Sequence, residues 1–425
     1  MPAESNAFPS LPDLLNRERL FGRTEALAGF TDPELPWTRR AFTDLHLQAR
    51  QWLAQQMQAA GMSVRTDAAG NLIGRLPGRN NTLPPLVTGS HIDTVVEGGR
   101  YDGIIGVLAG VEIAHALSQA GACFDHPFEV IDFLSEEPSD YGISCVGSRA
   151  MAGVLTPDML ASARPDGETL AQGLHRYGGD ARRLPEARRE PGSMAAFVEL
   201  HIEQGPVLEH EQLPVGVVSH IVGIRRLAIA VQGRPDHAGT TPMSIRCDAL
   251  LAASHVIQHA DRLARELAGK PHYVVSTVGR LLMSPNVPNA VPGRVELVLE
   301  VRSDSDDVLD SFPETVLERA AADIASLGAT VQTRALSRSH PVSCAPQAMQ
   351  AVEDAANALG YANRVLPSGA GHDAAYMAGL CPTGMVFIPC LNGRSHCPEE
   401  SITPQQLLDG TRVLAQALRL LDTAG

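Results

Sequence analysis

The stretch Leu86-Val-Thr-Gly-Ser-His-Ile-Asp-Thr94 decides how the first half of the chain folds. Residues 86–88 predict a short strand, which runs directly into the polar residues Gly89, Ser90 and His91. Downstream, apolar side chains recur at helical spacing at Val107, Val111, Ala114 and Leu117, and Gly121 predicts the end of that helix. A strand followed by a helix in this way indicates an α/β sheet.

Two further strands extend this sheet. The segment from Phe128 to Leu134 is almost continuously apolar, as expected of a strand buried on both faces, and it ends at Ser135-Glu136-Glu137. The segment from Phe197 to Ile202 predicts another strand. Residues 156–195 lie between these strands and are polar and rich in Pro, Gly and Arg, which predicts a surface excursion.

Residues 223–340 follow a different pattern. Strand and helix signals alternate in the order β-α-β-β-α-β, at 227–231, 250–267, 273–282, 295–301, 306–327 and 330–336. This order is that of a ferredoxin-like α+β unit, and its length suits a small inserted lid domain. The α/β pattern then resumes with a helix at 346–359, a strand at 385–388 and a last helix that Thr403 and Pro404 begin.

The predicted fold is therefore an α/β catalytic domain made of residues 1–222 and 341–425, with an inserted lid at 223–340. A length of 425 residues suits two domains, and a net charge of -14 argues against a nucleic-acid or anionic-membrane partner. No secretory signal is visible in the first 20 residues, and no apolar run approaches the roughly 20 residues of a membrane helix. Seven cysteines without a CxxC pair indicate reduced thiols and a cytoplasmic protein.

Imidazole and carboxylate side chains gather where the predicted strands end. They are His91, Asp93, Asp102, Glu136, Glu137, His201 and His396. In α/β sheets the loops at strand ends converge on one crevice, and two zinc-group metals need imidazole ligands, carboxylate ligands and a bridging carboxylate. Each residue alone has an ordinary explanation, such as a turn at Asp102-Gly103 or a solvated pair at Glu136-Glu137. Motifs of other enzyme classes, such as HExxH or GxSxG, are absent from the sequence.

Seven strings taken together resemble the hydantoinase/carbamoylase (ureido-amidohydrolase) branch of the dinuclear-zinc aminoacylase and carboxypeptidase clan. They are GSHIDTVVEGGRYDGIIGVLAGVE (89–112), SEE (135–137) with GSRAMAG (147–153), ELHIEQGPVLE (199–209), GRPDHAGTTPM (233–243), VPNAVPG (287–293), SGAGHDA (368–374) and SHCPEE (395–400). The resemblance implies a discontinuous dinuclear-metal domain with a mixed sheet flanked by helices, plus an inserted lid and dimerisation domain.

The resemblance also implies a role for each residue at the proposed site. Five metal ligands are implied: His91, Asp102 and His201 for one ion, and Asp102, Glu137 and His396 for the other, with Asp102 bridging. Glu136 would be the general base, Asp93 would orient His91, and His237 would stabilise the oxyanion. Gln204, Asn289, Arg302 and the loop Gly369-Ala370-Gly371 would bind substrate. For Arg302 the alternative is a solvated position beside Glu300 on the open face of the lid sheet.

By this resemblance the reaction is hydrolysis of the N-carbamoyl (ureido) C–N bond of a small carboxylate, most simply an N-carbamoyl-L-amino acid. Two divalent ions per subunit are implied, zinc or manganese, with cobalt or nickel also compatible, in a homodimer. One departure concerns substrate choice, because Asp140 stands where similar enzymes usually have an arginine. An allantoate amidohydrolase, a dipeptidase of the same clan and a catalytically silent metal-binding relative remain alternatives.

Overall fold

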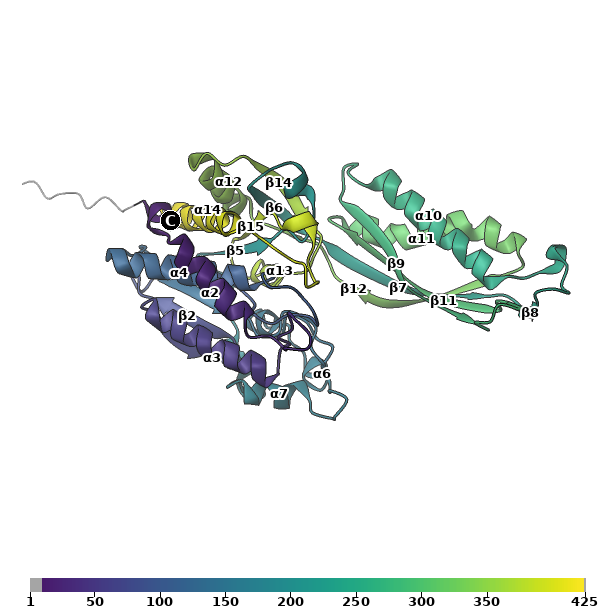
Figure 1. Cartoon of the computed structure of the whole chain (residues 1–425), viewed down its shortest axis with the longest axis horizontal. Helices are drawn as coiled ribbons and strands as arrows, with labels where there is room; N and C mark the ends of the chain where they lie inside the picture. The colour runs from purple at the N-terminus through teal and green to yellow at the C-terminus, as the bar shows by residue number, and fades with distance from the viewer. Residues whose placement is uncertain (1–9, 424–425) are drawn as a thin grey trace, which may run out of the picture. The chain divides into compact units, whose positions relative to one another are not determined.

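The computed structural model describes residues 10–423, which form two compact units (Figure 1). The first unit contains the described residues up to Ser219 together with Ser343–Leu366 and the chain from Gly371 onward. The second unit contains His220–Val342 and Pro367–Ala370. Among residues 10–423, no helix is both long and apolar enough to cross a bilayer.

A nine-stranded mixed sheet is the centre of the first unit. Its order is β1-β2-β4-β3-β5-β15-β6-β13, and β14 pairs with β6. The strands are β1 (Ser63–Thr66), β2 (Leu72–Leu76), β3 (Leu86–Ser90), β4 (Phe128–Asp132), β5 (Ala196–Ile202), β6 (Val215–Ile221), β13 (Val342–Ser343), β14 (Asn363–Ser368) and β15 (Thr383–Ile388). The four adjacent strands β4, β3, β5 and β15 are parallel, so their carboxyl ends lie along one edge of the sheet.

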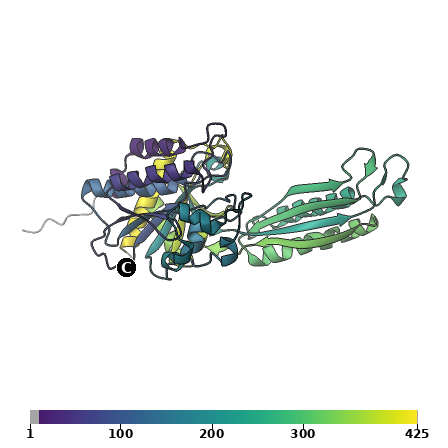
Figure 2. The same cartoon turned by 90° about the horizontal axis from the view of Figure 1, so that it is seen from below.

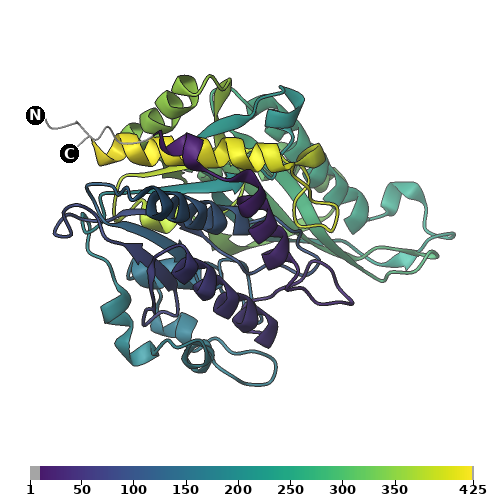
Figure 3. The same ribbon diagram turned by 60° about the vertical axis from the view of Figure 1, so that its left-hand side comes forward.

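One layer of helices covers one face of this sheet (Figure 3). It contains α1 (Leu11–Leu14), α2 (Arg17–Ala28), α3 (Asp44–Ala59), α4 (Ile104–Ala120), α12 (Pro346–Ala358) and α14 (Pro404–Asp422). Val198, Leu200 and Ile202 of β5 belong to the same buried core as the apolar residues of α4 and α14. Because side chains alternate along a strand, Glu199 and His201 point to the opposite face, where α13 (Ala374–Met377) contacts β5 and α5 (Val146–Met151).

The end of α4 and the start of α14 lie where the sequence predicts them. Gly121 ends α4 with φ +60°, a left-handed conformation that glycine adopts without a steric penalty. Thr403 caps α14 in a reciprocal capping box with Gln406, and Pro404 occupies the first turn. Both predicted boundaries are confirmed.

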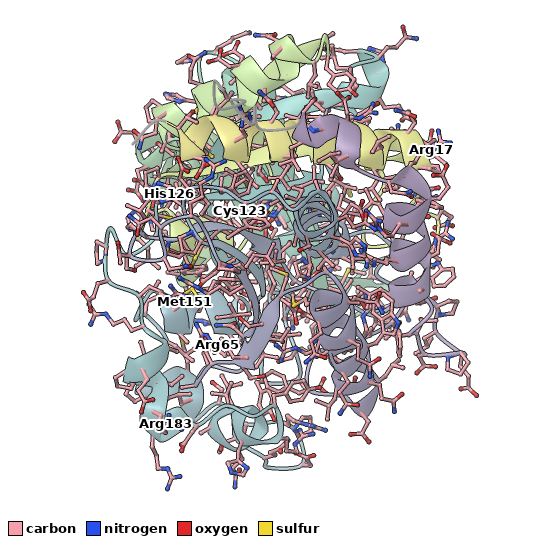
Figure 4. The ribbon with its side chains drawn as sticks, turned by 90° about the vertical axis from the view of Figure 1, so that its left-hand side faces the viewer. Arg17, Arg65, Cys123, His126, Met151 and Arg183 are labelled. Carbon is pink, nitrogen blue, oxygen red and sulfur yellow. The ribbon has the colours of Figure 1, made fainter. Side chains whose placement is uncertain are left out.

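The prediction of a surface excursion at 156–195 is wrong in part. The segment forms α6 (Pro157–Leu160), α7 (Leu170–Arg176), the 3-10 helix η1 (Ala181–Arg183) and α8 (Leu184–Ala187). Leu170 and Leu174, one helical turn apart, are fully buried and pack in a small separate core with Phe42 and Tyr177. Only the polar remainder of the segment is at the surface, as Arg183 at the rim of the unit illustrates (Figure 4).

The second unit has the predicted β-α-β-β-α-β order. Its antiparallel sheet, in the order β12-β7-β11-β9, consists of β7 (Gly223–Gln232), β9 (Val274–Ser284), β11 (Arg294–Ser303) and β12 (Thr330–Arg338). Helices α10 (Ala249–Leu267) and α11 (Asp306–Ser326) cover one face of that sheet (Figure 2). Val295, Leu297, Leu299 and Val301 alternate toward the helices and form this unit's own core.

The remaining elements are short. They are α9 (Val207–His210), β8 (Asp236–His237), the 3-10 helix η2 (Met243–Ile245), β10 (Ala290–Val291) and the 3-10 helix η3 (Leu391–Gly393). Strands β8 and β10 pair with each other as a separate two-stranded sheet in the second unit. The segment Pro367–Ala370 also belongs to the second unit, although its sequence position places it in the predicted catalytic half.

Candidate metal centre and active site

The parallel strands deliver the predicted ligands to one edge of the sheet. His91 follows β3 directly, Glu137 lies just beyond β4, His201 is the penultimate residue of β5, and His396 follows β15 by a short loop. Asp102 precedes α4, which packs on β3 and β5. Residues that are hundreds of positions apart in sequence therefore meet because adjacent parallel strands end together.

Two groups of donor atoms share the carboxylate of Asp102. In the first group, ligand atoms of His91, Asp102 and His201 all lie within 4.8 Å of one another, and in the second those of Asp102, Glu137 and His396 do so. Oδ1 of Asp102 is 3.2 Å from Nε2 of His201, whereas Oδ2 is 3.0 Å from Nε2 of His396. His396 Nε2 is also 2.9 Å from Oε1 of Glu137. One carboxylate facing two imidazole groups with its two oxygens is the arrangement of a bridging ligand.

The electrostatics of these groups fit divalent cations. Burial disfavours the charged form of Asp102, but the His201 and His396 imidazoles outweigh this effect and hold the Asp102 pKa well below its usual value. The carboxylates of Asp102 and Glu137 raise the pKa of His396 to about 11. Burial alone lowers the pKa of His201, but its contact with Asp102 outweighs this effect and raises it to about 9. The carboxylates thus stabilise positive charge at the place where mixed imidazole and carboxylate donors suit a zinc-group ion.

His201 provides a further test of fit. Its Nδ1 is 2.9 Å from the carbonyl oxygen of Ile202, so the hydrogen bond places the ring proton on Nδ1 and leaves Nε2 as the acceptor. Within residues 10–423, this buried Nε2 atom has no partner in hydrogen-bond geometry. At this buried nitrogen beside a carboxylate, a metal ion can take the place of the Nε2 proton, which is what a metal ligand requires.

Glu136 belongs to neither donor group, although it is adjacent to Glu137. Its carboxyl is buried, and Oε2 lies 3.7 Å from Nε2 of His91. Burial raises the pKa of Glu136 well above its usual value, and the negative charges of Glu137 and Asp373 raise it further. The thiol of Cys145 donates a hydrogen bond to Oε1 across 3.4 Å. A carboxyl that is close to the donor groups and easily protonated is suited to proton transfer.

Asp93 contacts His91 through its backbone carbonyl oxygen rather than through its side chain. Nδ1 of His91 bonds to the backbone carbonyl oxygen of Asp93 at 2.9 Å, while the nearest carboxylate oxygen is 3.7 Å away. The two carboxylate oxygens instead accept the N–H groups of Glu136 at 3.2 Å and Glu137 at 3.1 Å. The backbone of Asp93 orients His91, and its side chain holds the glutamate pair in place.

Glu199 and His372 also surround His201, and the sequence patterns did not single them out for this role. Ligand atoms of Glu199, His201 and His372 lie within 4.8 Å of one another, and the His372 ring packs edge-on against His201 at 4.5 Å between centroids. Glu199 accepts the Ser90 hydroxyl at 2.7 Å and the Ala374 N–H at 3.2 Å. The available signal was the spacing of Glu199 and His201 by two, which places both on one face of a strand.

Gln204 is in direct contact with the donor groups. Its Nε2 donates to Oδ1 of Asp102 at 3.1 Å and lies 3.4 Å from Nε2 of His396. Its Oε1 is buried and has no hydrogen-bond partner among the described residues. The side chain therefore presents an unused acceptor beside the donor groups, consistent with the expectation of substrate contact.

Two of the predicted site residues, the catalytic His237 and the substrate-binding Asn289, are neighbours at the two-stranded sheet of the second unit. Strand β8 places His237 opposite Ala290, and the N–H of Ala238 donates to the carbonyl oxygen of Asn289 at 3.0 Å. Nδ1 of His237 accepts the N–H groups of Gly239 at 3.0 Å and Thr240 at 3.2 Å. A neutral ring with Nδ1 occupied in this way carries its proton on Nε2, which is then a hydrogen-bond donor.

Arg302 is held by two contacts within the second unit. Its Nε donates to Oε1 of Glu300 at 2.7 Å, and Nη1 donates to the carbonyl oxygen of Gly369 at 2.8 Å. The structure thus brings Arg302 together with the predicted loop, in which the N–H of Ala370 bonds to Ser368 Oγ at 3.2 Å. Gly371 belongs to the first unit. A guanidinium oriented on two sides retains N–H groups for a carboxylate ligand.

The comparisons with known proteins agree with this fold. Residues 87–420 match the model of Peptidase family M20/M25/M40. The chain belongs to this family, whose members are metal-dependent.

Within that family the similarity is to amidases of the hydantoinase/carbamoylase type. N-carbamoyl-L-amino acid amidohydrolase from Geobacillus stearothermophilus is 40% identical over 94% of this chain and 97% of the relative. The enzyme of that name from Paenarthrobacter aurescens is 38% identical over 95% of this chain and 98% of the relative. The crystal structure of a hydantoinase/carbamoylase family amidase from Burkholderia multivorans superimposes with a TM-score of 0.89 at 36% identity, covering 96% of this chain and 98% of that one. The resemblance seen in the sequence is confirmed.

Proposed function

We propose that this chain hydrolyses the N-carbamoyl C–N bond of a small carboxylate, an N-carbamoyl-L-amino acid, to give the amino acid, carbon dioxide and ammonia. The observation that carries the proposal is the Asp102 carboxylate, whose two oxygens face two separate groups of imidazole and carboxylate donors. The similarity to two N-carbamoyl-L-amino-acid amidohydrolases over nearly the whole chain supports the substrate class.

Two divalent ions, zinc or manganese, with cobalt or nickel as alternatives, would be held by His91, Asp102 and His201 and by Asp102, Glu137 and His396. When bound, such ions polarise a carbonyl oxygen and acidify a water molecule. The protein supplies a donor set in which two buried imidazoles are already oriented by backbone carbonyl groups, His91 by Asp93 and His201 by Ile202.

Glu136 is the general base and then the general acid. It takes a proton from the attacking water, and the water oxygen bonds to the ureido carbonyl carbon as Glu136 becomes neutral. Glu136 then gives this proton to the terminal ureido nitrogen as the C–N bond breaks, and ammonia leaves. The remaining N-carboxylated product decomposes to carbon dioxide and the amino acid. The burial that raises the Glu136 pKa makes its neutral form accessible in the second step.

Polar side chains and backbone groups hold the substrate. Oε1 of Gln204 accepts a ureido N–H, and the protonated Nε2 of His237 donates to the developing oxyanion. Arg302 and Asn289 bind the substrate carboxylate, with the guanidinium making the bidentate contact. The backbone of Gly369, Ala370 and Gly371 completes the pocket. In this proposal residues 223–340 form the lid domain, and residues 1–222 and 341–425 form the catalytic domain.

A panel of substrates tests this assignment. The chain is stripped with a chelator, reloaded separately with zinc, manganese, cobalt and nickel, and ammonia release is measured from N-carbamoyl-L-amino acids, allantoate and dipeptides, with amino-acid detection for the dipeptides. Metal-dependent turnover of the N-carbamoyl compounds is expected. Faster turnover of allantoate or of dipeptides would assign the chain to one of those activities instead, and no turnover of any substrate by metal-loaded protein would identify a silent relative.

We also propose a homodimer in the cytoplasm. Strand β9 is at the edge of the second unit's sheet and exposes Val275, Leu281 and Leu282, and an exposed apolar edge strand is a template for pairing with another chain. All seven cysteines are free, which suits a reducing compartment. Sedimentation of the purified chain measures the oligomeric state directly.

A further inference from the structure

Glu400 has a buried carboxylate with no role in the proton transfer described above. It follows the loop that carries His396, and its side chain is almost completely excluded from solvent. Oε1 accepts the N–H of Tyr101 at 2.7 Å and the N–H of Asp102 at 3.1 Å, and Oε2 accepts the hydroxyl of Ser395 at 2.7 Å. All three donors are therefore satisfied by one side chain.

These three hydrogen bonds join two distant segments of the chain. One segment ends at Asp102, whose carboxylate is shared by both donor groups. The other contains Ser395, which immediately precedes His396, the imidazole of the second donor group. Asp102 and His396 are thus tied to the same carboxylate, one through its backbone and the other through the adjacent hydroxyl.

The backbone around Glu400 is shaped to permit this contact. Gly99 has φ +106°, and a Cβ atom there would lie 2.4 Å from the carboxyl carbon of Glu400, so only glycine allows the close approach. His396 has φ +55°, a left-handed conformation that costs energy for a non-glycine residue and persists only where surrounding contacts hold it. The Ser395 hydroxyl contact with Glu400 is one of the contacts that fix this part of the loop.

The two donor groups are otherwise supported unequally. The side chains of His91 and His201 are 3% and 1% exposed, and both rings are oriented by hydrogen bonds to backbone carbonyl groups. The side chain of His396 is 45% exposed. Its contacts through Nε2 are with Asp102, Glu137 and Gln204, which are themselves at the proposed site. The second group therefore depends more on support from its own loop.

We propose that Glu400 is a positioning residue that sets the affinity of the second cation, the one held by Asp102, Glu137 and His396, by fixing both Asp102 and the His396 loop. The inference rests on the two-cation site of the proposed function. It makes the second cation the more easily released of the two, and it assigns control of that release to Glu400 rather than to the neighbouring Glu399. Glu399 forms an ion pair with Arg394 at the surface and serves as the matched control.

The test is a count of bound zinc during titration of the zinc-loaded full-length chain with a chelator. The wild-type chain should hold two zinc ions and release them in two steps. In Glu400→Ala the more labile ion should leave at a chelator concentration lower by about 10-fold or more, as is typical when a carboxylate supporting a ligand is removed. The tighter ion should leave at its wild-type concentration, and Glu399→Ala should match the wild type at both steps.

Ser395→Ala keeps Glu400 but removes its link to the Ser395 hydroxyl, together with the 3.4 Å contact of that hydroxyl with Nε2 of Gln204. It keeps the test valid if Glu400→Ala does not fold. It should weaken the same ion by a smaller factor. Release profiles of folded Glu400→Ala and Ser395→Ala that coincide with Glu399→Ala would overturn the proposal, as would equal weakening of both ions or a wild-type chain that binds fewer than two. If the wild-type chain binds two zinc ions without hydrolysing N-carbamoyl amino acids, the proposed substrate fails while the role of Glu400 stands.

Discussion

The Sγ atom of Cys145 lies 3.4 Å from Oε1 of Glu136, and the thiol donates a hydrogen bond to this carboxylate oxygen. The same two residues are joined by a backbone hydrogen bond of 2.9 Å from the Cys145 N–H to the Glu136 carbonyl oxygen. Burial raises the pKa of the Cys145 thiol well above its usual value, so the thiol stays protonated and remains a donor. One oxygen of Glu136 is held by this contact, and Oε2 is left toward His91.

The first prediction follows from this contact. Cys145→Ala should lower kcat about fivefold with little change in KM or metal content, because a hydrogen bond of this kind contributes about 1 kcal/mol. Cys145→Ser retains a donor and should stay close to wild type. Steady-state kinetics with metal analysis checks both variants, and Cys381→Ala, a buried cysteine beside Thr383, is the control. Equal kcat values for Cys145→Ala and the wild type would show that the thiol does not position Glu136.

A second prediction concerns Glu136 itself. Glu136→Gln keeps the size of the side chain but cannot accept the proton of the attacking water, so kcat should fall by about 100-fold or more. Because Glu136 is in neither donor group, the variant should bind both metal ions as the wild type does. Metal content is measured beside turnover, and an active Glu136→Gln enzyme would contradict the assignment of the base.

Arg302 offers a third prediction, which separates charge from geometry. Arg302→Lys keeps the positive charge but loses the planar fork, and KM for the carboxylate substrate should rise about 10-fold or more, the cost of a lost charged hydrogen bond. Glu300→Gln keeps an acceptor for Nε but removes the charge of the 2.7 Å contact, and it should raise KM by less. An unchanged KM in Arg302→Lys would favour a solvated residue over a substrate clamp.

The fourth prediction decides whether His237 acts within its own subunit or across a dimer. Glu136→Gln and His237→Ala subunits are each expected to be nearly inactive as homodimers. If His237 serves the partner's site, mixing them under exchange conditions restores activity, because each mixed dimer contains one site with both wild-type residues. Activity that stays at the level of the separate variants, although exchange is shown with tagged subunits, would place His237 in its own subunit's site.

A fifth prediction concerns pH and stability through His46, which has no role in the proposed mechanism. Burial lowers the pKa of His46 well below 6.5, and the charges of Arg50 and Arg39 lower it further. The folded protein therefore keeps His46 neutral, while the unfolded chain takes up a proton as pH falls below about 6.5. This group makes stability fall with decreasing pH, by about 1.4 kcal/mol per pH unit in that range.

His46→Phe removes this contribution while keeping a ring to stack on Tyr177. It also removes two buried ring nitrogens that have no hydrogen-bond partner in the described part of the chain. Free energies of unfolding of both proteins, measured at equal metal loading between pH 7.5 and 5, should diverge in favour of the variant as pH falls. Parallel curves would show that His46 is not held neutral in the folded state.

Much of the fold was determined by local sequence patterns. The β-α-β-β-α-β order of the second unit, the glycine stop at Gly121 and the Thr403 cap were all predicted because each depends on residues within a few positions of one another. The short helices of 157–187 were missed because only two leucines, Leu170 and Leu174, mark their buried side in a polar stretch. Their packing partners, such as Phe42 and Tyr177, are distant in sequence or lie outside the helices.

For the site, the sequence determined which residue types are available and, through its resemblance to a family, which of them are predicted to be ligands, bridge and base. Only the tertiary structure decided their contacts. In the folded chain the Asp93 carboxylate accepts backbone N–H groups of the glutamate pair, and the Cys145 thiol donates to Glu136. Glu400 links Asp102 to Ser395 by accepting hydrogen bonds from both. The physical reason is that a hydrogen bond forms only when the donor–acceptor distance lies within a range of about half an ångström. Such precision across distant segments arises only when the whole sheet and its loops have packed.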